Sequence, residues 1–269
     1  MRAGAVLMRE AVFCFVLVVS SIGTNLCNGN NQMYKDKFEV GIFTCSNTAK
    51  MNYRFLKPIT VDTNEKYPLV LFLHGAGERG ADNEKQLNLG VWKYACEDMQ
   101  TRYPCFVIAP QCPQECKWVD VDWEADWHIM PKNPSKYMKA VLELVDNMTT
   151  KYPVDKQRIY VTGISMGGFG AWDMLQRRPK FFAAAVPLCG GGDVNYAPNI
   201  KDVPIWAFHN KGDDSVKSKR SRDMVKAIKR AGGHPIYTEY SVNNHNCWDA
   251  AYNDQDMYKW MFSQFRELD

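Results

Sequence analysis

The chain has 269 residues, of which 46% are hydrophobic and 13% aromatic, enough to bury the core of one large α/β domain. Its 33 Lys and Arg against 30 Asp and Glu give a formal charge of +3, which excludes the strong positive field typical of nucleic-acid-binding proteins. The basic run KSKRSR (217–222) lies on a predicted helix with apolar residues at helical spacing, so we expect a solvated helix face there.

The first 23 residues have the pattern of an export signal. Arg2 and Arg9 precede an apolar run, AVFCFVLVVSSI (11–22), which is short for a bilayer span, and Gly23 is a small residue near a cleavage point. We therefore predict a signal peptide over 1–23, a polar tether over 24–37 and a secreted, extracellular catalytic domain over 38–269. A retained N-terminal anchor is the alternative.

Strand-like and helix-like segments follow one another through the rest of the chain. Residues 38–45 and 51–58 alternate like an antiparallel pair. Dense apolar runs are typical of strands buried on both faces of a parallel sheet, and they occupy 67–75, 105–112, 158–165, 182–190 and 204–210, with a further strand at 235–241. Helices are predicted over 83–98, 135–151, 166–177, 216–231 and 253–267. The order predicts an α/β fold with a mostly parallel, twisted sheet of about eight strands and helices on both faces.

A long irregular segment, 112–134, is unusually aromatic, and loops of this length in compact domains tend to be functional. Its Trp118, Trp123 and Trp127, together with Trp248, are predicted to form an aromatic wall that binds a cinnamoyl group or a sugar ring. Burial of these tryptophans in an ordinary core is the alternative.

The stretch VTGISMGG (161–168) places Ser165 between glycines, where a predicted strand passes into a predicted helix. This is the pattern of a nucleophile elbow, in which a sharp turn exposes a serine hydroxyl, although an ordinary strand–turn–helix junction has the same letters. Acyl transfer also needs a base, an acid that orients the base, and hydrogen-bond donors for the oxyanion.

Candidates for the base and the acid follow in the chain order Ser, acid, His of α/β-hydrolases. Asp213 follows the predicted strand 204–210, with its neighbour Asp214 as a rival, and His245 lies in a polar loop after the last predicted strand. We expect His74 and His209 to brace the loops at the strand ends.

The segment His74-Gly75-Ala76-Gly77 allows backbone amides to approach a substrate oxygen closely. We predict that the N–H groups of Ala76 and Met166 form the oxyanion hole, with Gly77 as the fallback for the first donor. A plain turn after a buried strand is the alternative.

Four motifs together, LHGAGERG (73–80), GISMGG (163–168), HNKGDDSV (209–216) and HNCWDAAY (245–252), resemble a known family over about residues 38–267. The chain is similar to secreted α/β-hydrolase esterases of the dienelactone-hydrolase and prolyl-oligopeptidase-like group. That group includes feruloyl and acetyl-xylan esterases and polyhydroxybutyrate-depolymerase-like enzymes. The resemblance implies Ser165 as nucleophile, Asp213 as acid and His245 as base.

The chain departs from this family at three points. Asn210 stands where many relatives have glycine, and Lys217 stands where a proline often follows the valine, which leaves the choice between Asp213 and Asp214 open. A dienelactone hydrolase proper has a cysteine in place of Ser165, so that activity is not expected.

We therefore expect a serine esterase that hydrolyses hydroxycinnamoyl or acetyl esters of plant polysaccharide through an acyl-enzyme. No metal, organic cofactor, nucleic acid or stable membrane partner is expected. A general short-chain carboxylesterase, a serine peptidase of the prolyl-oligopeptidase type and a non-catalytic binding protein on a hydrolase scaffold are the alternatives. We also hypothesise a disulfide between Cys189 and Cys247 that fixes the histidine loop, against the alternative of two unrelated small apolar residues.

Overall fold

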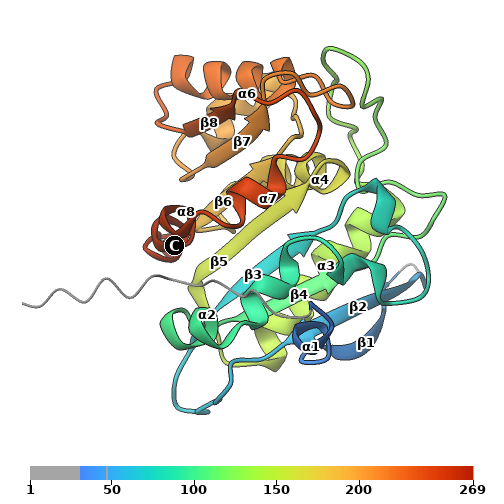
Figure 1. The fold of residues 1–269 in the computed structure, drawn as a ribbon, viewed down its shortest axis with the longest axis vertical. Coiled ribbons are helices and arrows are strands. Elements are labelled where there is room, and N and C mark those ends of the chain that lie inside the picture. The colour runs from blue at the N-terminus through green and yellow to red at the C-terminus, as the bar shows by residue number, and fades with distance from the viewer. Residues whose placement is uncertain (1–30, 47, 269) are drawn as a thin grey trace, which may run out of the picture.

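A computed structural model describes residues 31–46 and 48–268 of the chain, and one sheet runs through them (Figure 1). The predicted signal peptide, 1–23, lies outside the described residues. Within the described ranges, no helix is long and apolar enough to cross a membrane.

The sheet has eight strands in the order β1-β2-β4-β3-β5-β6-β7-β8. Strands β1 and β2 pair antiparallel, β2 pairs antiparallel with β4, and the other neighbours pair in parallel, which confirms the predicted α/β architecture. The strands are β1 (Glu39–Thr44), β2 (Lys50–Leu56), β3 (Tyr67–Leu73), β4 (Phe106–Pro110), β5 (Val154–Ile164), β6 (Ala184–Leu188), β7 (Trp206–Asn210) and β8 (Ile236–Tyr240).

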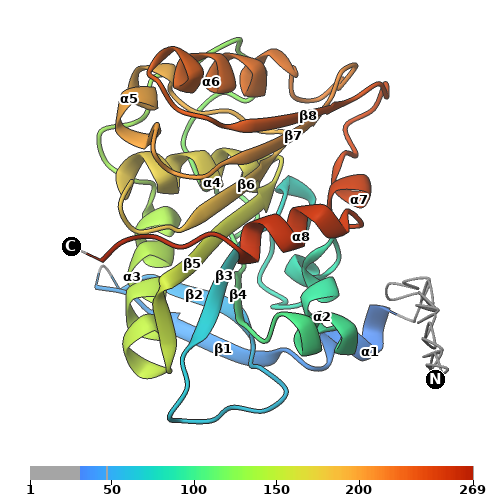
Figure 2. The ribbon, with the colours of Figure 1, turned by 90° about the vertical axis from the view of Figure 1, so that its left-hand side faces the viewer.

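Helices cover both faces of the sheet, as Figure 2 shows with α3, α4, α5 and α6 on one side and α2, α7 and α8 on the other. The α-helices are α1 (Asn31–Lys35), α2 (Glu97–Arg102), α3 (Lys136–Lys151), α4 (Met166–Arg177), α5 (Ala197–Ile200), α6 (Lys219–Arg230), α7 (Trp248–Ala251) and α8 (Gln255–Phe262). Strand residues alternate between the two cores: Leu69 and Leu71 pack with α3 and α4, whereas Val70 and Phe72 pack with α8.

The helix predicted over 83–98 is wrong, because that segment folds into two short 3₁₀ turns before α2 begins. Gly90 interrupts it with a φ of 74°, and a Cβ atom there would lie 2.5 Å from the ring of Tyr252. Only glycine satisfies both constraints, so the segment cannot continue as a regular helix. The last predicted helix is also shorter than expected, since α8 ends at Phe262.

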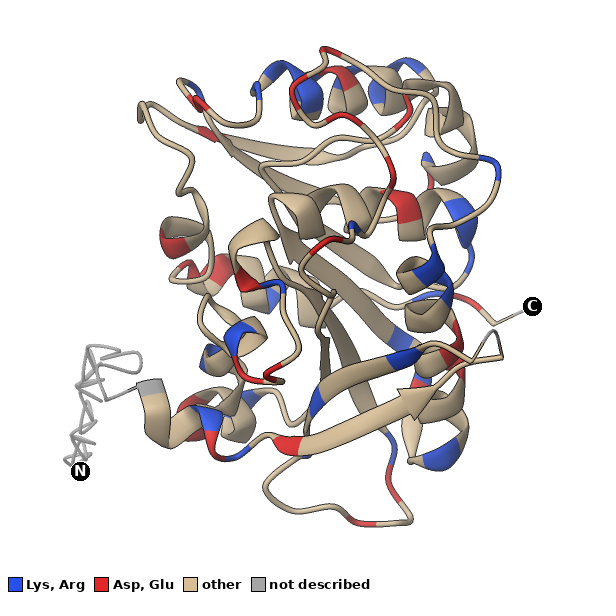
Figure 3. Cartoon of the chain, turned by 90° about the vertical axis from the view of Figure 1, so that its right-hand side faces the viewer, with Lys and Arg blue, Asp and Glu red and all other residues tan. Residues whose placement is uncertain are grey.

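Helix α6 carries most of the basic run on its outer face, and charges of both signs are interspersed over the rest of the chain (Figure 3). Met224 and Ile228 are buried on its inner face, which agrees with the predicted helical spacing. Arg220 is the exception within the run: its side chain is buried, lies over the ring of Phe169 and donates to the carbonyl of Ala125.

The carboxyl ends of β3, β5, β7 and β8 meet at one edge of the sheet. The loops that follow them carry the Gly75–Gly77 segment, Ser165, Asp213 and His245. Because parallel strands open their carboxyl ends toward a common crevice, the topology alone brings four distant segments together.

Candidate active site

Ser165 occupies the turn between β5 and α4 in a strained backbone conformation. Its φ is 53° and its ψ is −114°, far from the conformations that a residue with a Cβ atom ordinarily adopts. Its N–H donates to the carbonyl of Leu188 on β6, and its carbonyl accepts from the N–H of Phe169, so both sides of the turn are held. Strain of this kind persists only where the surrounding structure imposes it, which is typical of a functional position.

The glycines around Ser165 are required by close backbone contacts. A Cβ atom on Gly163 would lie 2.3 Å from the carbonyl oxygen of Gly167, and one on Gly167 would lie 1.9 Å from that of Leu73. A Cβ atom on Gly168 would lie 2.2 Å from the carbonyl oxygen of Leu188. The helix α4 can therefore begin directly against β3, β5 and β6 only because these positions lack side chains.

Replacement of Gly167 by alanine is expected to lower the free energy of unfolding by about 3 kcal/mol or more, because the obstructing atom belongs to the backbone of a buried strand. Gly77→Ala is the matched control: an added Cβ atom there meets nothing within 4 Å, and we expect a change within about 1 kcal/mol. Urea denaturation of both variants measures the difference, and equal effects would contradict the packing argument.

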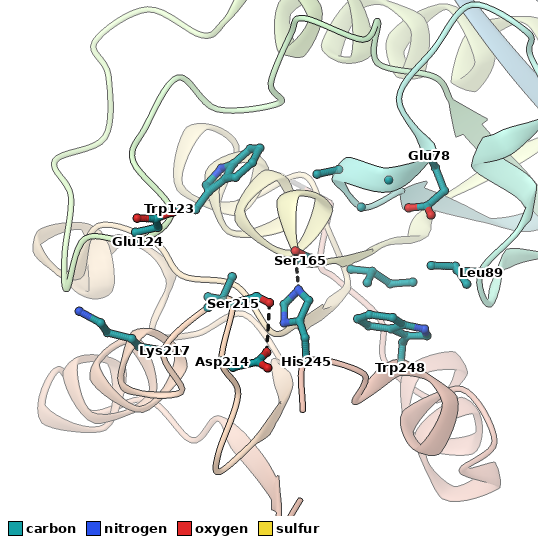
Figure 4. A pocket seen from close by; sticks show the side chains of 15 residues that line it. Glu78, Leu89, Trp123, Glu124, Ser165, Asp214, Ser215, Lys217, His245 and Trp248 are labelled. Atoms are coloured by element: carbon teal, nitrogen blue, oxygen red, sulfur yellow. Dashed lines mark hydrogen bonds between the residues drawn. The ribbon is translucent and has the colours of Figure 1, made fainter. Parts of the chain in front are cut away.

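His245 joins Ser165 to Asp213 through hydrogen bonds at both of its ring nitrogens. Its Nε2 lies 2.8 Å from Ser165 Oγ, and its Nδ1 lies 2.6 Å from Asp213 Oδ2. Figure 4 shows the first of these bonds at the centre of a cleft, with the imidazole edge pointing at the serine hydroxyl. The carboxylate can fix the orientation of the ring, and the ring can accept the serine proton.

Asp213 is buried and accepts hydrogen bonds on several sides. Besides His245, it contacts His209 Nε2 at 3.2 Å, and the N–H groups of Ser215 and Val216 donate to its Oδ1, each at 2.9 Å. Burial opposes ionisation of this carboxyl, but the hydrogen bonds from His209, His245 and the two amides outweigh it and hold the pKa of Asp213 well below its usual range. Its carboxyl is therefore ionised at neutral pH.

Asp214, the rival for the acid, is exposed at the rim of the cleft and accepts a hydrogen bond from Ser215 Oγ. The two neighbouring carboxyls thus point in different directions, and it is Asp213 that contacts His245. His209 braces this loop as expected, with its Nδ1 2.8 Å from Ser221 Oγ and its Nε2 2.9 Å from the carbonyl of Val216.

The loop after β3 lies beside Ser165, and Gly75, Ala76 and Gly77 all line the cleft. The buried side chain of His74 anchors this loop. Its Nε2 accepts a hydrogen bond from the N–H of Cys112 at 2.9 Å, and its Nδ1 lies 2.6 Å from the carbonyl of Gly75. The amide of Ala76, which we predict as an oxyanion donor, is thereby carried on a supported turn. Met166, the second predicted donor, is the first residue of α4.

Burial lowers the pKa of His74 to about 4. The unfolded chain takes up this proton near pH 6.5, so the folded state loses stability as the pH falls from 6.5 toward 4, by about 3 kcal/mol in total. We expect His74→Gln to be destabilised at pH 7.5 but to lose less further stability at pH 4.5 than the wild type does. Burial also lowers the pKa of His128 to about 4. The variant His128→Gln therefore measures how much of the acid sensitivity of the wild type comes from this second histidine. Equal acid sensitivity in the wild type and His74→Gln, measured by urea denaturation, would contradict the assignment.

The four predicted wall tryptophans do not form one surface. Trp123 and Trp248 line the cleft, and Trp248 packs against His245 with its ring at 85° to the imidazole. The prediction for Trp118 is wrong: its side chain is 0% exposed, and its Nε1 donates to the carbonyl of His74. Trp127 lies outside the lining of the cleft, with 66% of its surface exposed.

The cleft has a volume of about 880 Å³ and includes several residues that the sequence patterns did not single out as binding residues. Glu78 and Leu89 lie on the Trp248 side of Ser165, while Glu124 and Lys217 lie on the Trp123 side (Figure 4). Two basic groups lie over the ring of Trp123, with Lys117 Nζ 4.4 Å from its centroid and the guanidinium of Arg79 at 5.9 Å.

Cys189 and Cys247 are both thiols, so the predicted disulfide is wrong. The two side chains do meet near the site, and burial raises the pKa of Cys189 well above its ordinary value. Disulfide formation requires a thiolate, and a buried, protonated thiol resists it. Among the described cysteines, Cys96 is disulfide-bonded.

Cys189, Asp213 and His245 place one ligand atom each within 4.8 Å of one another, which is a possible arrangement for a metal ion. Asp213 and His245 already use these atoms in their mutual hydrogen bond. A bound ion would have to replace that bond, so the donor set fits the acid–base pair better than it fits a metal.

Comparison with known proteins places the chain among esterases. Residues 46–246 match the family model described as "Putative esterase". A solved thermostable esterase is 40% identical, with a TM-score of 0.81 over 87% of this chain and 64% of its own. A solved ferulic acid esterase is 18% identical, with a TM-score of 0.64 over 84% of this chain and 98% of its own, and shares the fold.

A curated relative, the bifunctional acetylxylan esterase/xylanase XynS20E of Neocallimastix patriciarum, is 27% identical over 112 residues. That match covers 42% of this chain and 17% of the relative, so the chain spans only part of the length of the relative. The family match covers most of this chain and includes Ser165, Asp213 and His245. The chain belongs to this esterase family.

Proposed function

We propose that the protein is a serine carboxylic-ester hydrolase that works through an acyl-enzyme on Ser165. The observation that carries the proposal is the continuous hydrogen-bonded path from Ser165 Oγ through His245 to Asp213, at 2.8 and 2.6 Å. The path opens into a cleft of substrate size beside a glycine-rich loop. Family membership supports the same reaction class.

In this mechanism His245 takes the proton of Ser165 while the serine oxygen attacks the ester carbonyl. The amides of Ala76 and Met166 hold the negative charge that develops on the carbonyl oxygen, and each such donor contributes about 3–4 kcal/mol to the transition state. The protonated His245 then gives its proton to the departing alcohol. Water activated by the same imidazole cleaves the acyl-enzyme, and Asp213 stabilises the imidazolium in both steps.

We propose hydroxycinnamoyl or acetyl esters of plant polysaccharide as the substrate class. The cleft presents Trp123 and Trp248 to an aromatic or sugar ring, and it is wide enough for a group larger than acetate. Two of the similar proteins, the ferulic acid esterase and the acetylxylan esterase/xylanase, are named for activity on such esters, which supports this substrate class. A general short-chain carboxylesterase is the alternative, because nothing in the triad itself selects the acyl group.

We also propose that residues 1–23 act as a signal peptide and that the enzyme is exported. The apolar run after Arg2 and Arg9 supports this, and so does the disulfide at Cys96, since such bonds persist in oxidising compartments.

A substrate panel tests the proposed function. Purified wild type and Ser165→Ala are assayed on p-nitrophenyl acetate, butyrate and octanoate, methyl ferulate, acetylated xylan and a proline-containing peptide amide. Turnover of methyl ferulate by the wild type alone would support serine catalysis on cinnamoyl esters. Activity confined to acetyl esters would instead indicate that the enzyme is a deacetylase. Cleavage of the amide would favour a peptidase. Two folded but equally inert proteins would contradict the enzyme assignment.

A further inference from the structure

A half-buried carboxylate, Glu78, lies inside the cleft and has no place in the mechanism above. It stands at the end of the 3₁₀ turn Ala76–Glu78, two residues after Ala76, the predicted oxyanion donor. Figure 4 shows its carboxylate pointing into the cleft on the same side of Ser165 as Leu89 and Trp248. This half of the cleft therefore has apolar walls with one acidic group between them.

Glu78 is close to the nucleophile. A methyl group in the position of a Cβ atom on Gly75 would lie 3.0 Å from Glu78 Oε2 and 3.8 Å from the Cβ atom of Ser165. One small group would thus touch both residues. Glu78 Oε2 and the Cβ atom of Ser165 are therefore separated by little more than the width of one methyl group, on the wall of the same cleft.

The charge of Glu78 is not neutralised by its surroundings. Among the described residues no basic side chain forms an ion pair with it, and the groups that favour its charged form are the backbone amides of Glu78 itself and Gly75. The adjacent Arg79 turns away, donating to the carbonyl of Ala76 at 2.9 Å and lying over the ring of Trp123. Burial raises the pKa of Glu78, as expected for a carboxyl without a cationic partner.

A carboxylate has about four sites that accept hydrogen bonds, and the carboxylate of Glu78 points into the cleft (Figure 4). A substrate that enters this region displaces the water around the carboxylate of Glu78. Loss of that water is unfavourable unless the substrate donates a hydrogen bond to the carboxylate in its place. A negatively charged group placed beside it would be repelled in a region of reduced dielectric constant.

We propose that Glu78 is a specificity-determining residue, which accepts a hydrogen bond from a hydroxyl group of the substrate and excludes esters that carry a negative charge in the Leu89–Trp248 half of the cleft. The inference rests on the proposed esterase function. Hydroxycinnamoyl groups and sugars both carry uncharged hydroxyl donors on a ring that apolar walls can hold. For these substrates the partner of Glu78 is a hydroxyl group and not an ammonium group.

The test uses matched esters that differ in one group. One series is methyl cinnamate with a para hydroxyl, methoxy, carboxylate or aminomethyl group, and the other is p-nitrophenyl 3-hydroxybutyrate, butyrate, hemisuccinate and 4-aminobutyrate. For the wild type we expect kcat/KM at least about tenfold higher for the hydroxyl member than for its methoxy or deoxy partner, and at least about tenfold lower for the carboxylate. These ratios need no variant and test the proposal by themselves.

Two variants then locate the effect. Glu78→Gln keeps the shape of the side chain and one acceptor oxygen but removes the charge, so the rejection of the carboxylate esters should shrink about tenfold relative to the neutral ones. Glu78→Leu should in addition lose the hydroxyl preference. Glu124→Gln removes one negative charge on the Trp123 side of the cleft. It should change the hydroxyl preference and the carboxylate rejection less than the Glu78 variants do. Thermal unfolding of each variant confirms that it is folded.

Three results would overturn the inference. The first is a wild type that turns over the esters without discriminating within either series, or that prefers the amino member. The second is a Glu78→Gln variant that slows all members equally, which would indicate a supporting role for the oxyanion loop. The third is a Glu124→Gln variant with the same shift, which would indicate a general field effect. A wild type that hydrolyses no ester at all would instead contradict the proposed function.

Discussion

Replacement of Ser165 by alanine is expected to lower kcat for ester hydrolysis by about a millionfold, with an unfolding temperature close to that of the wild type. The hydroxyl oxygen forms the covalent bond in the proposed mechanism, and within the described part of the chain it is hydrogen-bonded to His245 at 2.8 Å. Alanine removes that oxygen without adding volume to the turn. The backbone contacts that hold the elbow, from Ser165 to Leu188 and Phe169, do not involve the side chain.

The measurement is the hydrolysis of the best ester from the substrate panel, together with thermal unfolding of the same preparation. Ser215→Ala is the matched control, because Ser215 is a second serine on the wall of the same cleft, and we expect it to change kcat by less than about tenfold. A Ser165→Ala protein that is folded and keeps more than about one hundredth of the wild-type rate would contradict nucleophilic catalysis by this residue.

Asp213→Asn is expected to lower kcat by about ten thousandfold. The side chain keeps its shape, but the amide no longer carries the charge that stabilises the imidazolium, and its N–H₂ group can force the wrong tautomer on His245. The low pKa of Asp213, maintained by His209, His245 and two amides, means that the wild-type carboxyl stays charged throughout the neutral range. Any loss of wild-type activity between pH 7 and 5 therefore does not come from protonation of Asp213.

Steady-state kinetics of Asp213→Asn and Asp214→Asn compare the two neighbouring acids directly. Asp214 is exposed and bonded to Ser215 Oγ, so its replacement should cost less than about tenfold in kcat. Equal losses in the two variants, or the larger loss in Asp214→Asn, would show that the acid was assigned to the wrong residue.

The fold and the positions of Ser165 and His245 could be predicted from the sequence because each depends on local patterns. Apolar runs that end in glycine, proline or a polar residue define the buried strands, and the order of strands and helices fixes which loops share an edge of the sheet. The choice between Asp213 and Asp214 could not be made in this way. The two side chains differ only in the direction in which a turn of the loop presents them, and that direction is set by contacts with His209 on β7 and His245 on a distant loop.

The tryptophans show a second limit. Trp118 and Trp123 are five residues apart in one irregular segment, yet the first is buried under the His74 loop and the second lines the cleft. Without a regular period, an aromatic loop gives no information about which rings face solvent. The segment 83–98 fails for a related reason: its composition suits a helix, but the fit of Gly90 against the ring of Tyr252 is a tertiary contact with no local signature.

Glu78 was visible in the motif LHGAGERG, but nothing in that motif assigns it to the wall of a cleft. Its place in the site depends on the 3₁₀ turn after β3, and the cleft that it lines is completed by Leu89 and by Trp248 from a distant segment. The proposed substrate selectivity therefore rests on residues that tertiary structure brings together, whereas the proposed chemistry could be inferred from sequence motifs.

The most direct test of the central claim is covalent labelling of the nucleophile. The purified protein is treated with diethyl p-nitrophenyl phosphate, which phosphorylates an activated serine irreversibly, and is then digested and mapped by mass spectrometry. We predict one label per chain, on the peptide that contains Ser165, with loss of ester hydrolysis in proportion to labelling. Hydrolysis that survives full exposure to the reagent, or a label on a residue other than Ser165, would contradict the account.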